Sequence, residues 1–166
     1  ISHVDEGMVT ILGDDDGLLP DALSTVNSLC HTTGLRAVRS AVGLFYWPQF
    51  LSDDAASQTT ALVSNGYQIR DCQKYLQRVL NGHNGYGDLP LLYTGGFVDI
   101  SIVNQMKLVD SPLFRSINPD IYSAIAIAHC IDSYVYTFRS LAIGGYSKHD
   151  RLPFANKKAL GVCGST

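Results

Sequence analysis

Residues 8–20 of this chain read MVTILGDDDGLLP, and this stretch carries the strongest information about the fold. Met8–Leu12 is a short apolar and β-branched run, which predicts a buried parallel strand. Gly13–Gly17 is an acidic turn, and Pro20 stands where it could open a helix. The apolar positions of that helix are Leu19, Ala22, Leu23, Val26, Leu29 and Cys30. Open α/β sheets bind ligands at such strand–turn–helix units, beyond the carboxyl ends of their strands.

Three consecutive carboxylates, Asp14, Asp15 and Asp16, form the turn. They repel one another, so a fold that gathers them normally supplies a counter-charge, most often a divalent cation with a phosphorylated ligand behind it. The alternative is a solvated acidic turn whose charges stabilise the following helix N-terminus. A calcium-binding EF-hand loop fits poorly, because Leu18 would stand at its third ligand position.

Composition limits the function classes. The chain has 166 residues, 46% of them hydrophobic and 16% charged, with a formal net charge of −3. We expect one domain over residues 1–150 and a basic, flexible tail over 151–166. Nothing in the charge pattern suggests a partner nucleic acid or a membrane surface. No apolar segment approaches the ~20 residues of a transmembrane helix. The four cysteines are widely spaced, which favours reduced thiols and a cytoplasmic protein.

The remaining sequence predicts a mixed α/β domain. The expected strands are 36–47, a short one near 60–64, 89–93, 134–138 and 141–146, and the expected helices are 69–80, 98–108 and one beginning at Asn118-Pro119-Asp120. Between them, residues 82–88 are the most glycine-rich stretch and predict a mobile loop.

Four segments together resemble a known family. Residues 11–23, ILGDDDGLLPDAL, look like the acidic DXD-motif segment of family-2 nucleotide-sugar glycosyltransferases, which have the GT-A fold. The segments 46–48 (YWP), 89–93 (LPLLY) and 119–124 (PDIYSA) are similar in order and spacing to a bacterial branch of that family. The resemblance runs from about residue 8 to about residue 150.

The resemblance implies transfer of a sugar from a nucleoside diphosphate sugar to a sugar or lipid-linked acceptor. Mn²⁺ or Mg²⁺ held by Asp14 and Asp16 would bridge the two phosphates of the donor. The motif can be aligned one residue either way, so Asp15 is a further candidate, as a metal ligand or as a ribose contact.

Asp120 matches the position of the family's general base, the carboxylate that deprotonates the acceptor hydroxyl. The family more often has Glu-Asp where this chain has Pro119-Asp120. An acid in the first turn of a helix also stabilises the helix dipole without any catalysis, and the two interpretations explain this residue equally well.

Candidate substrate contacts follow from the same resemblance. Tyr93, Thr94 and Gly95 correspond to the segment in front of the acceptor-side helix, where glycine allows backbone to approach a sugar, although a plain turn would look the same. Trp47 could stack on a sugar ring or simply pack in the core.

Three basic or titratable residues near the end of the chain, Lys148, His149 and Arg151, loosely resemble the segment that closes over the diphosphate in such enzymes. Solvated charges on a tail are the alternative interpretation.

The chain reaches its acidic motif within its first 13 residues, whereas the family places base-recognising βαβ units ahead of it. We therefore expect a fragment that lacks most of the N-terminal nucleotide-binding half. The alternative function is a non-catalytic, degenerate GT-A half that binds a partner or forms a homodimer through an exposed sheet edge. A phosphatase-type Mg²⁺ site is a third hypothesis, with no partner motif for its nucleophile.

Overall fold

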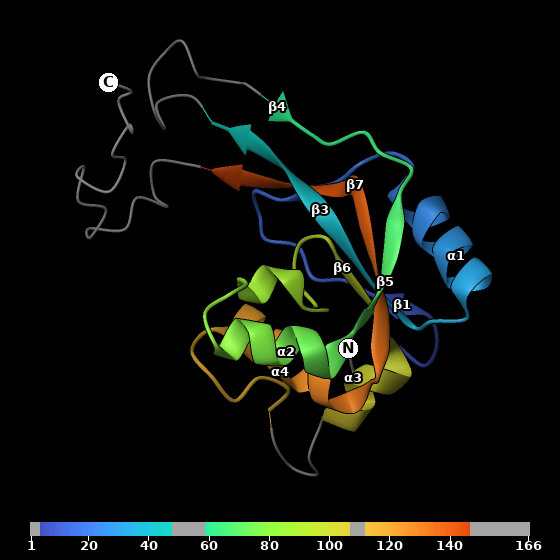
Figure 1. The fold of residues 1–166 in the computed structure, drawn as a ribbon. Helices are drawn as coiled ribbons and strands as arrows, with labels where there is room; N and C mark the ends of the chain where they lie inside the picture. The colour runs from blue at the N-terminus through green and yellow to red at the C-terminus, as the bar shows by residue number, and fades with distance from the viewer. Residues whose placement is uncertain (1–3, 48–58, 107–111, 147–166) are drawn as a thin grey trace, which may run out of the picture.

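The computed structural model describes residues 4–47, 59–106 and 112–146 (Figure 1). The strands are β1 (Met8–Val9), β2 (Gly17–Leu18), β3 (Ala37–Tyr46), β4 (Thr59–Thr60), β5 (Tyr67–Asp71), β6 (Gly96–Asp99) and β7 (Ser133–Tyr146). The helices are α1 (Ala22–Thr33), α2 (Cys72–Leu80), the short 3₁₀ turn η2 (Tyr86–Asp88), α3 (Ile100–Met106) and α4 (Pro119–Cys130).

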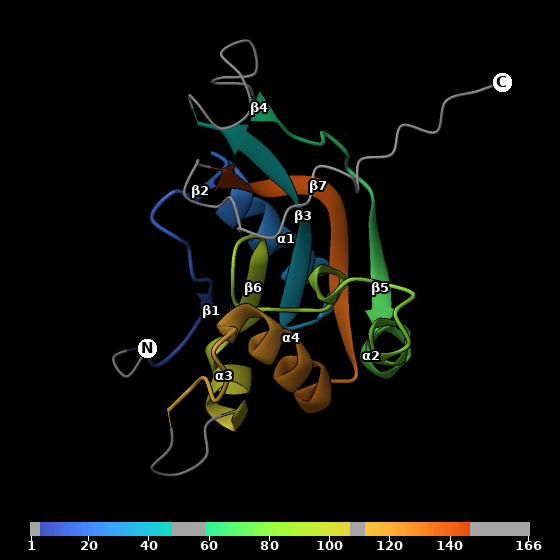
Figure 2. The same cartoon turned by 90° about the vertical axis from the view of Figure 1, so that its left-hand side faces the viewer.

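These strands form one mixed, open sheet, with the order β1-β6-β3-β7-β2 (Figure 2). The central pair, β3 and β7, runs parallel, and the other described pairs are antiparallel. Strand β4 adds to β3, and β5 adds to the first half of β7. The predicted α/β class, with a mixed sheet flanked by helices, is confirmed.

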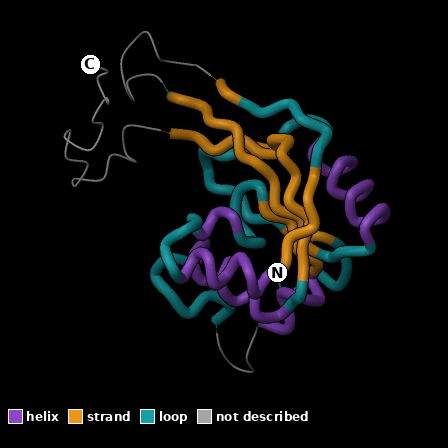
Figure 3. The backbone as a smooth tube through the Cα atoms, viewed as in Figure 1, coloured by secondary structure: helices purple, strands orange, loops and turns teal. Residues whose placement is uncertain are grey.

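Helices cover both faces of the sheet (Figure 3). Successive strand residues point to opposite faces, so Ala37, Val98 and Tyr134 pack with α2, α3 and α4. Val38, Phe97 and Val135, each one residue away from these, pack instead against Ala22 and Val26 of α1. The first halves of β3 and β7 are therefore buried on both sides of the sheet, and this explains why the successive residues Ala37-Val38 and Tyr134-Val135 are all buried.

Strand β1 differs from the prediction. We expected a buried parallel strand over Met8–Leu12, but the strand is Met8–Val9, is half-buried, and runs antiparallel to β6. Beyond it, the Ile11 N–H donates to the Leu92 carbonyl at 2.6 Å, so the chain leaves the β6 ladder. An apolar run does not reveal the direction of its neighbour, and the prediction of a parallel strand was wrong.

Helix α1 is confirmed with two corrections. Its N-cap is Asp21, so Pro20 precedes the helix and is not its first residue. Leu23 is 66% exposed, while Ala22 and Val26 form the buried stripe. At the other end, Gly34 has φ +70°, a left-handed conformation that glycine adopts readily, and its N–H donates to Cys30.

Residues 67–80 also differ from the prediction, which started a helix at Ile69. Ile69 lies in β5, paired with Val135, and helix α2 begins at Cys72. Asp71 fixes this boundary, because its carboxylate accepts the Lys74 N–H at 2.7 Å as an N-cap.

The predicted strand 89–93 is absent. Leu89, Leu91 and Leu92 are buried, but Pro90 has no N–H to donate to a sheet. The Leu92 N–H donates to the Ser123 hydroxyl at 3.3 Å. This apolar segment is a core loop that packs on α4, and it leads into β6.

The other boundaries shift by smaller amounts. The predicted helix 98–108 is α3, Ile100–Met106: it starts later because Val98 belongs to β6, and its predicted end at 107–108 lies outside the described residues. The short strand near residue 60 is Thr59–Thr60. The two predicted strands after residue 133 are one strand, β7, whose pairing with β3 shifts register around Ser40–Val42. Helix α4 begins at Pro119 as predicted.

Cys30, Cys72 and Cys130 are free thiols, and Cys163 lies outside the described residues. None of the described helices combines the length and the apolar character required to cross a membrane.

Candidate functional site

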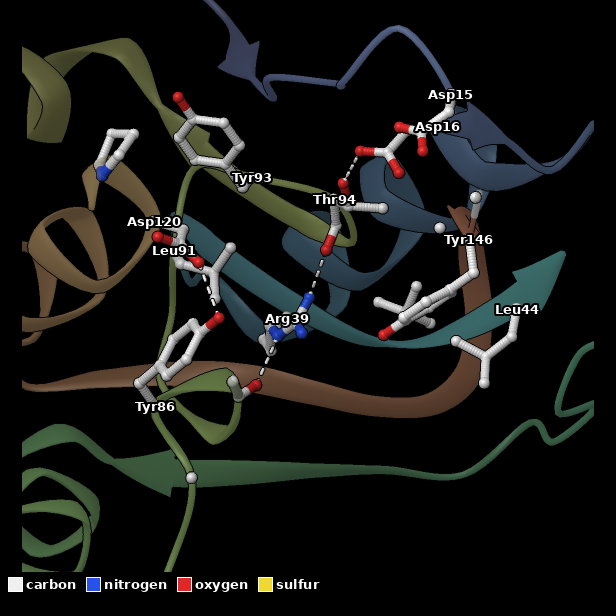
Figure 4. Close-up of a pocket in the computed structure, with 16 residues that line it drawn as sticks. Asp15, Asp16, Arg39, Leu44, Tyr86, Leu91, Tyr93, Thr94, Asp120 and Tyr146 are labelled. Carbon is white, nitrogen blue, oxygen red and sulfur yellow. Dashed lines mark hydrogen bonds between the residues drawn. The ribbon is translucent and has the colours of Figure 1, made fainter. Parts of the chain in front are cut away.

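A pocket of about 690 Å³ lies beside the second half of the β3–β7 pair (Figure 4). Its walls come from segments far apart in the chain: the acidic turn before β2, strand β3, the loop at η2, the segment before β6, the start of α4 and the end of β7. The lining residues are Asp15, Asp16, Arg39, Val42, Leu44, Gly85, Tyr86, Gly87, Leu91, Tyr93, Thr94, Pro119, Asp120, Gly144, Gly145 and Tyr146.

Asp16 is held firmly at this pocket. Its Oδ2 accepts the Gly13 N–H at 2.9 Å and the hydroxyl of Thr94. Its Oδ1 lies 3.6 Å from the point where a Cβ on Gly144 would stand, so the absence of a side chain there leaves space beside the carboxylate. Two donors thus fix Oδ2 of Asp16, whereas Oδ1 lies beside Gly144, which also lines the pocket.

Its two neighbours in the motif are placed differently. Asp15 is half-buried and lines the pocket. Its backbone carbonyl oxygen lies so close to Gly145 that a Cβ at that position would clash with it. Asp14 is exposed and is not among the lining residues. The structure therefore brings Asp15 and Asp16 together at the pocket, and it leaves Asp14 outside.

Asp120 lies on the opposite side of the pocket from Asp15 and Asp16 (Figure 4). It lies in the first turn of α4. Its Oδ2 accepts the Tyr86 hydroxyl at 2.7 Å. This hydrogen bond, together with burial, raises the pKa of Tyr86 to about 12. The tyrosine therefore remains a proton donor to Asp120 at neutral pH.

Of the substrate contacts predicted from the sequence, two line the pocket and two lie next to it. Tyr93 and Thr94 line the pocket. Gly95 lies behind it, with φ +80°, and a Cβ there would stand 2.6 Å from Arg39 Nη1. Trp47 is 44% exposed at the end of β3, and its Nε1 lies 3.0 Å from the Cβ position of Gly145. Trp47 therefore adjoins the pocket without lining it.

Arg39 and Tyr86 were missed by the sequence analysis. Arg39 lies between the acidic turn and Asp120 (Figure 4). Its Nε donates to the Gly87 carbonyl and its Nη1 to the Thr94 carbonyl, both at 2.7 Å. Burial lowers its pKa. One signal could have found it, since a charged residue directly after Ala37 and Val38 in a predicted strand is unusual.

The carboxylates at the pocket can hold part of a metal coordination sphere. No group of three or more His, Cys, Asp or Glu side chains suited to a metal occurs within residues 4–47, 59–106 and 112–146. Mg²⁺ and Mn²⁺ sites often use one or two protein carboxylates and complete their shell with water and substrate phosphates. Asp16 and Asp15 fit that smaller donor set. Lys148, His149 and Arg151 lie outside the described residues.

Comparison of the sequence with protein-family models and with curated proteins finds no match.

Proposed function

We propose that this domain transfers a sugar from a nucleoside diphosphate sugar to an acceptor hydroxyl, as a GT-A-type glycosyltransferase with a divalent cation. One observation carries the proposal: the acidic turn at Asp15 and Asp16 and the carboxylate of Asp120 line the same pocket. A transferase of this kind needs both, one to hold the leaving diphosphate and one to accept a proton from the attacking hydroxyl.

Asp16 and Asp15 would hold the cation in this proposal. When bound, a divalent cation supplies charge neutralisation to the leaving diphosphate. Thr94 and the Gly13 N–H keep the Asp16 carboxylate in place before any ligand arrives. Such preorganisation removes the need for the carboxylate to reorient during the reaction. Asp14, the other candidate ligand, is exposed outside the pocket, and the geometry therefore favours the pair Asp15 and Asp16.

Asp120 is the proposed base. The Tyr86 hydroxyl occupies one side of Oδ2 and so orients the carboxylate. The acceptor hydroxyl would donate its proton to this carboxylate as its oxygen attacks the anomeric carbon, while the bond to the diphosphate breaks. Tyr93 lines the pocket between Asp16 and Asp120 (Figure 4). Its aromatic ring is of the kind on which a sugar ring can stack.

Thermal stability in the presence of Mn²⁺ tests the proposal, with and without uridine, guanosine or thymidine diphosphate. We expect Mn²⁺ with one of these nucleotides to stabilise the protein, by about 2.7 kcal/mol at a hundred times the Kd. Asp16→Asn should abolish that stabilisation. Asp120→Asn should keep it, because the base is not needed for binding, and Asp14→Asn tests the alternative ligand pair.

The control is Asp132→Asn, which removes an exposed carboxylate outside the pocket and should respond as the wild type does. Absence of stabilisation by Mn²⁺ with all three nucleotides would contradict the enzymatic proposal.

A second candidate function is a non-catalytic module that pairs with another copy of itself. The observation that favours it is the exposed apolar side of β5: Ile69 is 59% exposed and Tyr67 42%. Nearby, Leu62 is 61% and Val63 91% exposed. Within the described residues β5 pairs with β7 alone, so its other edge can accept a further strand.

A further inference from the structure

Arg39 has too few protein partners for a guanidinium placed inside a pocket. Guanidinium carries five N–H donors. Within the described residues, Arg39 donates one from Nε to Gly87 and one from Nη1 to Thr94. Both acceptors are neutral carbonyl groups, so these bonds orient the guanidinium plane but leave its charge uncompensated.

No carboxylate of the described residues forms an ion pair with Arg39. The two ion pairs there are Arg70 with Asp88 and Arg139 with Asp21. Asp88 is the nearby acid whose charge acts on Arg39, but its carboxylate is already bound by Arg70 at 3.1 Å and by Asn84 at 2.8 Å. A half-buried cation without a direct counter-ion is costly unless something else supplies the negative charge.

The surroundings of Arg39 fix the guanidinium and keep it close to the pocket. A Cβ on Gly95 would stand 2.6 Å from Nη1, so a side chain there would displace the group. A Cβ on Gly87 would stand 3.6 Å from Nη2. Backbone without side chains therefore surrounds the guanidinium on two sides, and Arg39 itself forms part of the pocket lining.

We propose that Arg39 makes the centre of this pocket a binding site for an oxyanion, a phosphate or a carboxylate group of a substrate. The planar fork of Arg matches these groups, and charge-assisted hydrogen bonds to them are about twice as strong as neutral ones. The anion would lie between Asp16 and Asp120, where the donor and the acceptor meet in the proposed reaction. That the anion belongs to a substrate rests on the proposed function, whereas its binding by Arg39 does not.

Two sources have this chemistry: the diphosphate of the donor and an acidic sugar acceptor. Titration calorimetry with pyrophosphate and, separately, with D-glucuronate distinguishes them. Both titrations are made in EDTA, so that a failure of the metal site does not affect the result. We expect one of the two anions to bind the wild-type chain. Pyrophosphate binding assigns the site to the donor, and binding of glucuronate alone assigns it to the acceptor.

Variants then test the role of Arg39. Arg39→Gln should weaken the binding by roughly 10- to 100-fold, because one charged pair of hydrogen bonds is lost. Arg39→Lys keeps the charge without the fork and should weaken it less. The matched control is Arg36→Gln, since Arg36 is exposed, precedes β3, and donates to Ser101 away from the pocket.

If the Arg39 variants do not fold, the amide NMR spectrum of the wild-type protein still tests the proposal. Amide resonances of Gly87, Thr94 and Gly95 should shift when the bound anion is added. Binding of neither anion by the wild type would overturn the proposal. Equal binding by Arg39→Gln, or shifts confined to residues away from the pocket, would overturn it as well.

Discussion

Single residues decide what this pocket can do, and Tyr86 shows how. Its hydroxyl donates a hydrogen bond to Asp120, from a loop that lies far from α4 in the sequence. The same loop presents Gly87 to Arg39. One tight turn, η2, therefore positions both the proposed base and the proposed anion-binding group. A change at Tyr86 should act on Asp120 while it leaves Arg39 in place.

Tyr86→Phe should change the dependence of stability on pH. The tyrosine pKa is 10.0 without the fold and about 12 in the folded protein. Between these values the unfolded chain has lost the proton that the folded chain keeps, so folding stability falls as pH rises from 10 to 12. Below pH 10 the contribution of Tyr86 is fully present.

Urea unfolding of both proteins from pH 8 to pH 12 measures this difference. The wild-type advantage over Tyr86→Phe should stay constant up to about pH 10 and shrink above it. Burial also raises the pKa of Tyr134, but this residue is present in both proteins and cancels. Parallel stability curves up to pH 12 would show that Tyr86 does not hold its proton through Asp120.

At the scale of elements, capping residues decided boundaries that hydrophobic spacing could not. Ile69, Cys72 and Leu76 have helical spacing in the sequence, yet Ile69 is in a strand because the helix begins only after Asp71. The start of α4 was predictable, since Asn118-Pro119-Asp120 is a local signal. The segment Leu89–Leu92 was not, because apolar residues can be buried in a strand or in a core loop.

Asp71→Ala should test the start of α2. Loss of the side-chain acceptor for the Lys74 N–H is expected to lower the free energy of unfolding by about 1 kcal/mol. Asp71→Asn is the matched variant, because asparagine caps helices nearly as well. Urea denaturation measures both. If Asp71→Ala were as stable as Asp71→Asn, the cap would not determine where α2 begins.

The candidate site was predictable to a similar degree as the elements. The sequence pointed to the acidic turn, Thr94 and Asp120, and the structure brings Asp16, Thr94 and Asp120 to one pocket. Arg39 and Tyr86 could not be assigned in advance. Their importance comes from contacts with Gly87, Thr94 and Asp120, which depend on how distant segments pack. Such tertiary neighbours have no local spacing in a single sequence.

At the scale of the whole molecule, β5 lies at an edge of the sheet and presents apolar side chains to solvent. Strand β5 exposes Tyr67 and Ile69, and edges of this kind invite pairing with another strand. Around the first halves of β3 and β7, by contrast, helices cover both faces of the sheet (Figure 3). Self-association, if the module pairs with a second copy, is therefore expected at β5.

Ile69→Lys should convert a β5-paired dimer to a monomer, because a charge on an edge strand opposes pairing. Light scattering after size-exclusion chromatography gives the mass. Leu80→Lys is the control, since Leu80 is 68% exposed on α2 and lies outside the strand edge. A wild-type monomer at all concentrations, or a dimer that survives Ile69→Lys, would contradict pairing through β5.

The parallel pairing of β3 with β7 has a consequence for how the chain acquires its structure. Val38 pairs with Val135, so the centre of the sheet joins segments separated by most of the described chain. Closing so large a loop is slow, and contacts of this kind dominate the folding rate of such topologies. During synthesis, β3 lacks its central neighbour until residues 133–146 have left the ribosome. Between the synthesis of β3 and that of β7, the nascent chain therefore lacks the central strand pair of its sheet, and chaperone protection should matter most in this interval.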